Sequence, residues 1–406
     1  MVLVGAPGRP MRSANLARAL LKAGHEVVLW TADFQHMEHK HQFGGTKTVT
    51  PEQGLVIHFL QSRGYRRNIG FERLVDHAQL AWNLKSELRK AEPPDVAFVG
   101  YPPIEPAFVM VEWLKKRSVP TLLDVKDRWP DVLLRALPAS VRPLGRVALS
   151  PHYALAARTF RDVSGITSIT ESFLRWSLRE AGRSRGDWDQ VVPLTAPETT
   201  LTMQERQKAG AWWDTMGVPD DGRPRASFVG TLGASFDFRP VAQAARTVDA
   251  QFVICGTGSQ EAKVAALFAR MTNVVLPGWV STQQAEVLAG RSSVALAPYV
   301  PTEDFLDSLP NKLFDALAHG LPFVTSLQGE VGTLIADHDV GRTYDYTDPD
   351  DLAGVLGVLM SHPEVAYRLG RNAKELYASR YSVDVVYGRL VGLLERLAAG
   401  RSGVEP

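Results

Sequence analysis

The sequence predicts an α/β protein with two domains, and three observations support this prediction. The chain has 406 residues, which is too long for one hydrophobic core and suits two domains of about 200 residues. Short apolar runs, such as residues 55–60 and 120–125, alternate along the chain with segments of helical periodicity. Several of these runs lead into glycine-containing loops, an arrangement typical of nucleotide-binding folds.

Composition places the chain among ordinary globular proteins. Hydrophobic residues make up 45% and charged residues 22% of the sequence, so global disorder is excluded. No apolar run approaches the roughly 18 to 20 residues of a membrane span, and no signal peptide is expected. The single cysteine, Cys255, lies in the apolar run FVICG; we expect it to be buried, and a cytoplasmic location to suit the chain.

Charge is unevenly distributed along the chain. Residues 1–195 contain 27 lysines and arginines against 19 acids, so the two halves carry net charges near +8 and −7. This asymmetry fits a basic domain seated on an anionic membrane, at its inner face, or on a lipid phosphate. It fits equally well two halves that attract each other.

The predicted elements of the first half follow a strand–helix order. The opening strand (residues 1–5) leads into the loop APGRP and a helix from Ser13 to Ala23, without a G-x-G-x-x-G fingerprint. Further strands are predicted at 25–31, 55–60, 96–99, 120–125, 165–170 and 191–195, and helices at 71–91, 105–117, 153–160 and 171–181. The strand ending at Val125 runs directly into KDRWPD, so Lys126, Asp127 and Trp129 are expected at the carboxyl end of a parallel sheet. The alternative is structural, with Asp127 capping a turn and Trp129 in the core.

In the second half, glycine loops again follow strands. Polar residues 196–225 are interpreted as a crossing between domains, with Trp212 and Trp213 in a short helix. The strand at 227–229 then leads into the loop Gly230 to Gly233, whose glycines let the backbone approach a diphosphate closely. Two more strand-and-loop units follow, QFVICGTGS and NVVLPGWVS, and a final helix is predicted from Ser382 to Ala399.

Residues 302–324 concentrate the chemistry. Pro310 and Asn311 open an apolar helix that ends at Gly320. Its N-terminus, Ser308 to Lys312, offers backbone N–H groups and a lysine charge to a phosphate. Asp315, in the first turn, is placed to accept hydrogen bonds from ribose hydroxyls, and Asp307 could reach a sugar beyond the diphosphate.

This stretch resembles the E-x(7)-E signature of the family-four retaining glycosyltransferases, here as D-x(7)-D from Asp307 to Asp315, followed by AHGLP for the family's A-x-G-x-P. GHEV at 24–27 resembles a segment typical of GT-B N-terminal domains. DVKDRWPD at 124–131 is similar to the D-x-[RK]-D-x-W-P element of a bacterial surface-polysaccharide subgroup, which includes O-antigen and capsule enzymes, and this places Lys126 where many family-four enzymes have a histidine. The resemblance implies a GT-B fold, α/β with two Rossmann-like domains facing each other across a deep cleft. The expected domains are 1–198, on the acceptor side, and 199–381, which binds the nucleotide-sugar, with helix 382–406 packing back on the first.

The resemblance also implies a function and a set of site residues. The expected reaction is retaining, metal-independent hexosyl transfer from a nucleoside-diphosphate-sugar to a glycan or lipid-linked glycan in polysaccharide or lipopolysaccharide biosynthesis, with no cofactor and no nucleic acid. The basic pair that usually follows the glycine loop is missing before Arg239, and Lys312 and Lys126 are expected to compensate. The implied catalytic residues are Asp307, Lys126 and Lys312; the donor-binding residues are Gly230, Thr231, Gly233, Gly278, Val280, Ser308, Leu309, Asn311 and Asp315; the acceptor-side residues are Gly8, Arg12 and Asp127.

Three alternatives stay open at this point. His36, His39 and His41 could form a metal site, although a polar acceptor-side loop is the preferred interpretation because no fourth ligand accompanies them. The enzyme could instead be a nucleotide-sugar 2-epimerase of GT-B architecture, which needs acid–base residues in the cleft. The chain could also be a nucleotide-sugar-binding subunit without catalytic activity, which the missing basic pair would explain.

Overall fold

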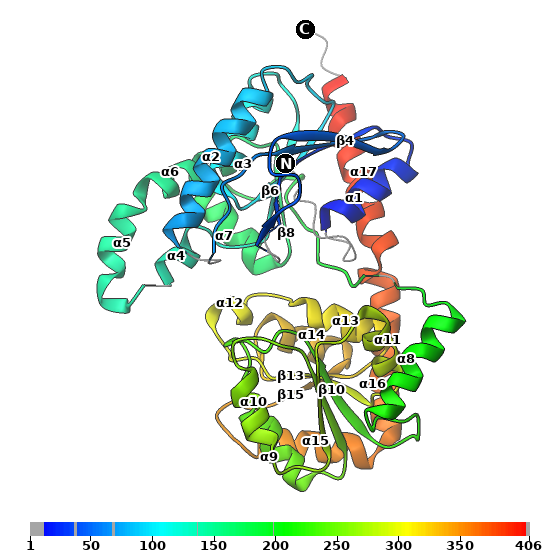
Figure 1. The fold of residues 1–406 in the computed structure, drawn as a ribbon. Coiled ribbons are helices and arrows are strands. Elements are labelled where there is room, and N and C mark those ends of the chain that lie inside the picture. Colours follow the sequence, from blue (N-terminus) through cyan, green and yellow to red (C-terminus); the bar gives the residue numbers. More distant parts are fainter. Residues whose placement is uncertain (1–11, 36–38, 67–69, 136, 198, 403–406) are drawn as a thin grey trace. The chain divides into compact units, whose positions relative to one another are not determined.

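The computed structural model describes residues 12–35, 39–66, 70–135, 137–197 and 199–402 (Figure 1). The described residues form two compact units. One contains those up to Pro193 together with those from Val386 onward, and the other contains Leu194–Val385. Over the described ranges, no helix combines the length and apolarity that crossing a membrane requires. The predicted strand at 1–5, its loop and Gly8 lie outside the described residues.

The first unit contains a four-stranded parallel sheet and a smaller mixed sheet. The parallel sheet has the order β6-β7-β8-β9, with β6 at Ala97–Tyr101, β7 at Thr121–Val125, β8 at Gly165–Ser168 and β9 at Gln190–Val191. The mixed sheet has the order β1-β5-β4, with β1 at Val27–Ala32, β4 at Lys47–Glu52 and β5 at Leu55–Leu60; β2 (Phe34–Gln35) and β3 (Lys40–His41) form a separate hairpin. All five residues of β7 are buried, as expected for a central parallel strand covered on both faces.

Helices surround these sheets. They are α1 (Arg12–Lys22), α2 (Phe71–Glu87), α3 (Ile104–Lys115), α4 (Asp131–Arg135), α5 (Arg142–Ala148), α6 (Ser150–Arg161) and α7 (Glu171–Ala181), with the later part of α17 (Val383–Ser402). The 3₁₀ turn Ala139–Val141 precedes α5. The main core of this unit packs apolar residues of α2, α3, α6 and α7 against β6, β7 and β8.

The second unit is built on one parallel sheet of order β12-β11-β10-β13-β14-β15. Its strands are β10 (Arg225–Val229), β11 (Gln251–Cys255), β12 (Val274–Gly278), β13 (Val294–Ala297), β14 (Phe323–Thr325) and β15 (Gly341–Thr343). Counted along this unit the order is 3-2-1-4-5-6, that of a doubly wound nucleotide-binding fold, and it reverses direction between β10 and β13. Ligands of such sheets bind at the carboxyl ends of the strands where the order reverses.

Helices cover both faces of this sheet, and alternate side chains of β11 pack against the helices on opposite faces. Phe252 and Ile254 join the core that includes α9 and α15, whereas Val253 and Cys255 face α8 and α11, because successive side chains of a strand point to opposite faces. The helices are α8 (Met203–Thr215), α9 (Arg239–Thr247), α10 (Glu261–Phe268), α11 (Thr282–Gly290), α12 (Glu303–Leu306), α13 (Asn311–His319), α14 (Glu330–His338), α15 (Asp351–Ser361) and α16 (Pro363–Leu376), followed by the π-helical turn Tyr377–Tyr381. The expectation that Cys255 is buried is confirmed.

The segment interpreted as a crossing between domains is instead part of the second unit. Helix α8 packs on α11, and the fully buried Trp213 donates its indole N–H to the carbonyl of Gln284 at 2.8 Å. A capping box at Thr202 and Glu205 starts this helix. The interpretation failed because the composition of residues 196–225 is polar and rich in glycine, which does not indicate that Trp213 is buried against the second unit.

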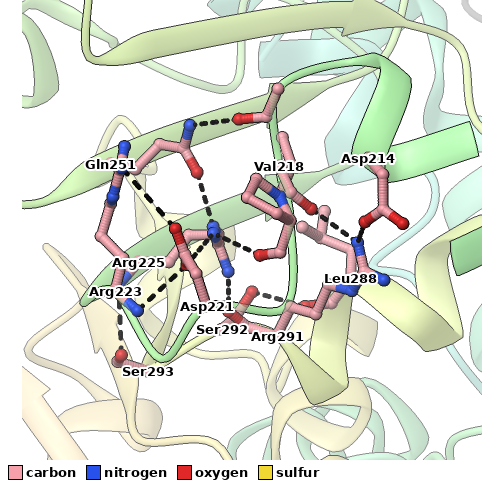
Figure 2. A network of polar contacts seen from close by, with 12 residues as sticks. Asp214, Val218, Asp221, Arg223, Arg225, Gln251, Leu288, Arg291, Ser292 and Ser293 are labelled. Atoms are coloured by element: carbon pink, nitrogen blue, oxygen red, sulfur yellow. Dashed lines mark hydrogen bonds and ion pairs between the residues drawn. The ribbon is translucent and has the colours of Figure 1, made fainter. Parts of the chain in front are cut away.

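A polar network anchors the same segment at the amino end of the sheet (Figure 2). Arg225, 1% exposed, donates to Gln251 Oε1 at 2.7 Å and to the carbonyls of Pro219 and Arg291 at 3.0 and 2.5 Å. Arg291 in turn contacts Asp214 of α8 at 2.7 Å. The buried Arg225 guanidinium is stabilised because its N–H groups donate to several separate acceptors.

Candidate functional site

The loops after β10 and β13 are joined at the point where the strand order reverses. The backbone N–H of Asp237 donates to the Pro298 carbonyl at 2.8 Å, and that of Val300 donates to the Ser235 carbonyl at 2.9 Å. The two loops therefore form one continuous backbone surface at the carboxyl ends of the central strands. This is the position at which a doubly wound fold binds its ligand.

Glycines allow the neighbouring loops to pack backbone against backbone. Gly230 N–H donates to the Cys255 carbonyl at 3.0 Å, and Gly256 N–H donates to the Gly278 carbonyl at 2.7 Å. A Cβ atom at Gly256 would overlap the Gly230 carbonyl oxygen, and Gly256 has a φ of 140°. Only glycine satisfies both conditions, so the loops after β10, β11 and β12 are held close together.

Lys312 enters this surface from the first turn of α13. Its ammonium donates to the Val229 carbonyl and lies 4.3 Å from the centroid of the Phe228 ring. A Cβ atom at Gly230 would overlap the ammonium nitrogen and lie 2.9 Å from Lys312 Cε. The absence of a side chain at Gly230 thus makes room for the cation at the end of β10. Lys312 is close enough to Cys255 to oppose the effect of burial, which raises the pKa of that thiol to about 12.

Helix α13 begins and ends as predicted. Pro310 precedes it in an extended conformation, and Gly320 ends it in the left-handed conformation with φ of 66°. Asp315 is half-buried one turn after Asn311, which is exposed. Burial raises the pKa of Tyr299, and the charge of Asp315 acts in the same direction, which places this carboxylate beside the loop after β13.

The residues before α13 occupy a tight turn. Asp307 follows α12 directly and its N–H donates to the Glu303 carbonyl at 3.2 Å. Asp307 and Ser308 are half-buried, whereas the Leu309 side chain is buried in the core below. Leu309 can therefore offer a ligand only its backbone.

His319 supports the far end of α13, and sequence reasoning did not find it. Its Nδ1 lies 2.6 Å from the Asp315 carbonyl and its Nε2 lies 3.0 Å from Glu286 of α11. Burial lowers the pKa of His319, but the hydrogen bond and charge of Glu286 outweigh it and raise the pKa above 6.5. The i, i+4 spacing of Asp315 and His319 was the available signal.

The loop after β12 exposes an aromatic side chain that sequence reasoning also missed. Gly278 has φ of 76° and the Val280 side chain packs in the core, so backbone is what both can present. Between them, Trp279 is 71% exposed. The sequence signal was the tryptophan in LPGWVS, which directly follows a predicted strand and its glycine.

The glycine loop after β10 carries no free arginine in place of the missing basic pair. Thr231 is exposed and Gly233 half-buried. Arg239, the first basic residue after them, is 2.5 Å from Asp237, and Tyr346 donates to the same carboxylate at 3.0 Å. Lys312 is therefore the cation that this structure places against the loop.

In the first unit, Arg12 belongs to the core. Its guanidinium forms two hydrogen bonds with Asp124, at 2.7 and 2.8 Å, and a third with the Pro193 carbonyl at 2.8 Å. Burial lowers the pKa of Arg12 but the charge of Asp124 more than offsets it. The expected contact of Arg12 with the acceptor stays a prediction, and the structure adds that its guanidinium is paired with Asp124 inside the first unit.

The KDRWPD motif follows β7 as expected, and its side chains divide between core and surface. Trp129 is buried and lies under Arg73, 4.7 Å from its guanidinium carbon, while Asp131 accepts from Tyr153 at 2.5 Å. Lys126 is half-buried and Asp127 exposed. Burial lowers the pKa of Lys126, against the charge of Asp124. Trp129 thus has the structural role of the alternative interpretation, whereas Lys126 and Asp127 stay near the surface.

The histidines considered for a metal site do not converge where they are described. His39 Nδ1 lies 2.9 Å from the Tyr65 carbonyl, and His41 Nδ1 lies 3.2 Å from Asp33; His36 lies outside the described residues. Across the parts of the chain that the structure describes, no three His, Cys, Asp or Glu side chains are grouped as a metal ion would need.

Comparisons with known proteins agree with this geometry. Residues 224–362 match the family model of glycosyl transferases group 1, a range that contains every site loop of the second unit. A search of curated protein sequences finds no match.

Solved structures show the fold. A sucrose-phosphate synthase from Thermosynechococcus elongatus is 14% identical with a TM-score of 0.69, and covers 95% of this chain and 92% of its own. WaaG, a glycosyltransferase involved in lipopolysaccharide biosynthesis, is 12% identical with a TM-score of 0.61, covering 94% of each chain. Anabaena HepE in complex with UDP is 10% identical with a TM-score of 0.62, covering 97% and 99%. The chain therefore has the predicted GT-B fold, and its residues 224–362 carry the pattern of group 1 glycosyl transferases.

Proposed function

We propose that this protein is a retaining glycosyltransferase that moves a sugar from a nucleoside diphosphate to a hydroxyl of a glycan or lipid-linked glycan. The proposal places the reaction in the synthesis of a bacterial surface polysaccharide. The group 1 match and the fold support sugar transfer, and the HepE complexes with UDP and with UDP-glucose make a nucleotide-sugar the natural donor class. WaaG, with its part in lipopolysaccharide biosynthesis, supports the choice of acceptor class.

One observation carries the proposal most directly. The Lys312 ammonium is held against Gly230 at the end of β10, beside the N-terminus of α13. Cation, glycine backbone and helix N-terminus favour the same ligand, a phosphate group. They meet at the strand-order reversal, where a doubly wound sheet binds nucleotides.

The remaining contacts with the donor substrate are assigned relative to this phosphate-binding position. We assign the diphosphate to Lys312 and to the backbone of Gly230, Thr231 and Gly233. Asp315 would accept hydrogen bonds from the ribose hydroxyls and Asp307 would contact the transferred sugar. The turn residues Ser308, Leu309 and Asn311 would add donor contacts, and the nucleobase would lie against the backbone of Gly278 and Val280 with Trp279 as a flanking ring.

The reaction proposed is a front-face substitution. The acceptor hydroxyl oxygen forms a bond to the anomeric carbon on the face from which the diphosphate departs, and a donor phosphate oxygen takes the hydroxyl proton. The protein supplies no nucleophile in this scheme. It positions both substrates and stabilises the charge that develops on the diphosphate, which Lys312 does without a metal ion. Lys126 and Asp127 of the first unit are proposed to serve on the acceptor side.

Donor binding is the first test. A thermal-shift screen of nucleotide-sugars identifies the donor, because a ligand that binds only the folded state raises the melting temperature. Isothermal titration then compares Asp315→Asn with Asp337→Asn, an exposed carboxylate on α14. We expect only the first change to weaken donor binding, by about 10-fold or more. Equal donor affinity in the two variants would remove the ribose assignment.

Analysis of the reaction products distinguishes a glycosyltransferase from a 2-epimerase and from a binding subunit without activity. We expect transfer to an acceptor hydroxyl with the anomeric configuration of the donor, observed by NMR, and unchanged rates in excess EDTA. An epimerised nucleotide-sugar formed without acceptor would establish the 2-epimerase instead. Tight donor binding with neither hydrolysis nor transfer over a panel of glycan acceptors would establish the binding subunit, consistent with the engaged Arg239.

A further inference from the structure

Two phenylalanine rings form an aromatic cage beside the Lys312 ammonium. The ammonium nitrogen lies 4.3 Å from the centroid of the Phe228 ring and 5.4 Å from that of the Phe236 ring. The two rings meet edge to face, with centroids 4.9 Å apart and planes at 76°, so they form two walls of the cage. An ammonium group within about 6 Å of a ring centroid is attracted to the electron-rich face of the ring. Because a ring has no net charge, this attraction holds the cation without neutralising it.

Phe236 also begins a row of stacked rings that reaches α12. Its centroid lies 4.6 Å from that of Tyr299, and the Tyr299 centroid lies 4.7 Å from that of Phe305. An isolated backbone bridge between Phe236 and Tyr299 supports the first contact. Phe305 belongs to α12, and Asp307 follows that helix directly. Aromatic pairs at these separations stabilise a structure beyond the area that they bury, so the row ties the turn at Asp307 to the loop after β10.

A close backbone contact also holds α12. Gly329 directly precedes α14, and a Cβ atom at Gly329 would overlap the carbonyl oxygen of Leu306, the last residue of α12. The glycine therefore lets the start of α14 pack directly on this carbonyl. The contacts of Phe305 and Leu306 together fix the turn in which Asp307 lies.

We propose that Phe236 is a positioning residue for both ends of the donor. On one side it holds Lys312 against the diphosphate, and on the other it sets the position of Asp307 against the transferred sugar through Tyr299 and Phe305. Phe236 lies in the loop after β10 and Lys312 lies in α13, so the ring keeps beside this loop a cation that another element supplies. The inference rests on the proposed function for the roles of Lys312 and Asp307.

NMR of the full chain, with ¹³C-labelled lysine, tests the aromatic cage without a nucleotide. Protons above the face of an aromatic ring are shifted upfield. The Hε signals of Lys312, assigned by their loss in Lys312→Gln, should therefore lie upfield of those of exposed lysines. Phe236→Leu should move them toward the exposed position, and Phe236→Tyr should retain them. The matched control is Phe268→Leu, which changes a buried ring of the same core and should leave the signals unchanged.

Pyrophosphate is the probe for the diphosphate position, because it contains neither base nor sugar. Titration followed by the Lys312 signals should show about three- to tenfold weaker binding to Phe236→Leu than to the wild type. Phe268→Leu and Phe236→Tyr should bind pyrophosphate as the wild type does. The wild-type spectrum tests the cage by itself, even if a variant does not fold.

Isothermal titration tests the row of rings, with the nucleotide-sugar identified by thermal shift and its nucleoside diphosphate. Phe305→Leu should weaken the nucleotide-sugar by about threefold or more and leave the nucleoside diphosphate within about twofold of the wild type. Phe236→Leu should weaken both ligands, and Phe305→Tyr should restore binding of the nucleotide-sugar.

Three results would overturn the proposal. They are Lys312 signals at the exposed position in the wild type, equal pyrophosphate affinities of the wild type and Phe236→Leu, and equal losses of both nucleotide ligands in Phe305→Leu. Failure of the proposed function gives a different result. In that case no nucleotide-sugar binds, while the Lys312 signals and the pyrophosphate titration still support the aromatic cage.

Discussion

Replacing Gly230 by alanine is expected to disable donor binding without unfolding the protein. The new Cβ would overlap the Lys312 ammonium, lie 2.9 Å from its Cε, and meet the Phe228 ring only at 3.4 Å. Lys312 is the far end of a flexible side chain, so it moves and the backbone stays. The variant keeps every charged group of the site and displaces one of them.

The magnitude follows from what Lys312 loses. A hydrogen bond to a charged group contributes about 1.5 to 3 kcal/mol, and each 1.4 kcal/mol changes a binding constant about tenfold. Donor affinity should therefore fall by about 10- to 100-fold. Stability should change by less than about 1 kcal/mol, because Gly230 lies outside the left-handed region of φ and the entropy that alanine removes from the unfolded chain offsets the lost bond to Val229.

Isothermal titration with the donor identified by thermal shift measures the effect, and chemical denaturation measures stability. The matched control is Gly354→Ala in α15, where an added Cβ meets no atom within 4 Å; it should leave donor affinity unchanged. The decisive comparison is a double-mutant cycle with Lys312→Gln. If Gly230→Ala costs as much donor affinity in the Lys312→Gln background as in the wild type, it does not act through Lys312 and the reasoning is refuted.

Two further predictions concern groups that support the second unit. Glu286→Gln removes the partner that raises the pKa of His319 above 6.5, so the wild type should have the larger free energy of unfolding at about pH 6. This difference in stability should vanish as the pH rises to about 9, because His319 then loses its proton in both proteins. Chemical denaturation at both pH values measures the difference, and a difference that grows with pH would contradict the prediction. Arg225→Met should lower the free energy of unfolding by about 3 kcal/mol, since it leaves the buried Gln251 side-chain oxygen and two partly buried carbonyls without their donor. Arg223→Met, at an exposed position of the same segment, should stay within about 0.5 kcal/mol of the wild type, and similar losses for both would argue against the network.

The sequence was informative where a feature is local. Within the described residues, which leave out the expected strand at 1–5, the predicted strands and helices of both halves are present because apolar periodicity and glycine or proline boundaries lie within each element. The helix from Asn311 to His319 could be predicted from its own nine residues and their flanks, Pro310 and Gly320. The glycine loops could likewise be recognised in GTLG and GTG, which adjoin their strands.

Features that depend on residues far apart in the sequence could not be predicted. Arg12 looked available for a ligand because Asp124, 112 residues away, could not be identified as its partner. Lys312 could be placed near a phosphate, but its fit against Gly230 needs the pairing of two loops separated by some eighty residues.

Trp213 determines where the second unit can be divided from the first. An expression fragment that began at β10, where the recognised family pattern starts, would discard this indole and open a void against Val253 and Leu288. Such a fragment would expose an aliphatic surface to solvent and tend to aggregate. A fragment intended for isolated donor titrations should start upstream of Thr202, so that the capping box of α8 is retained.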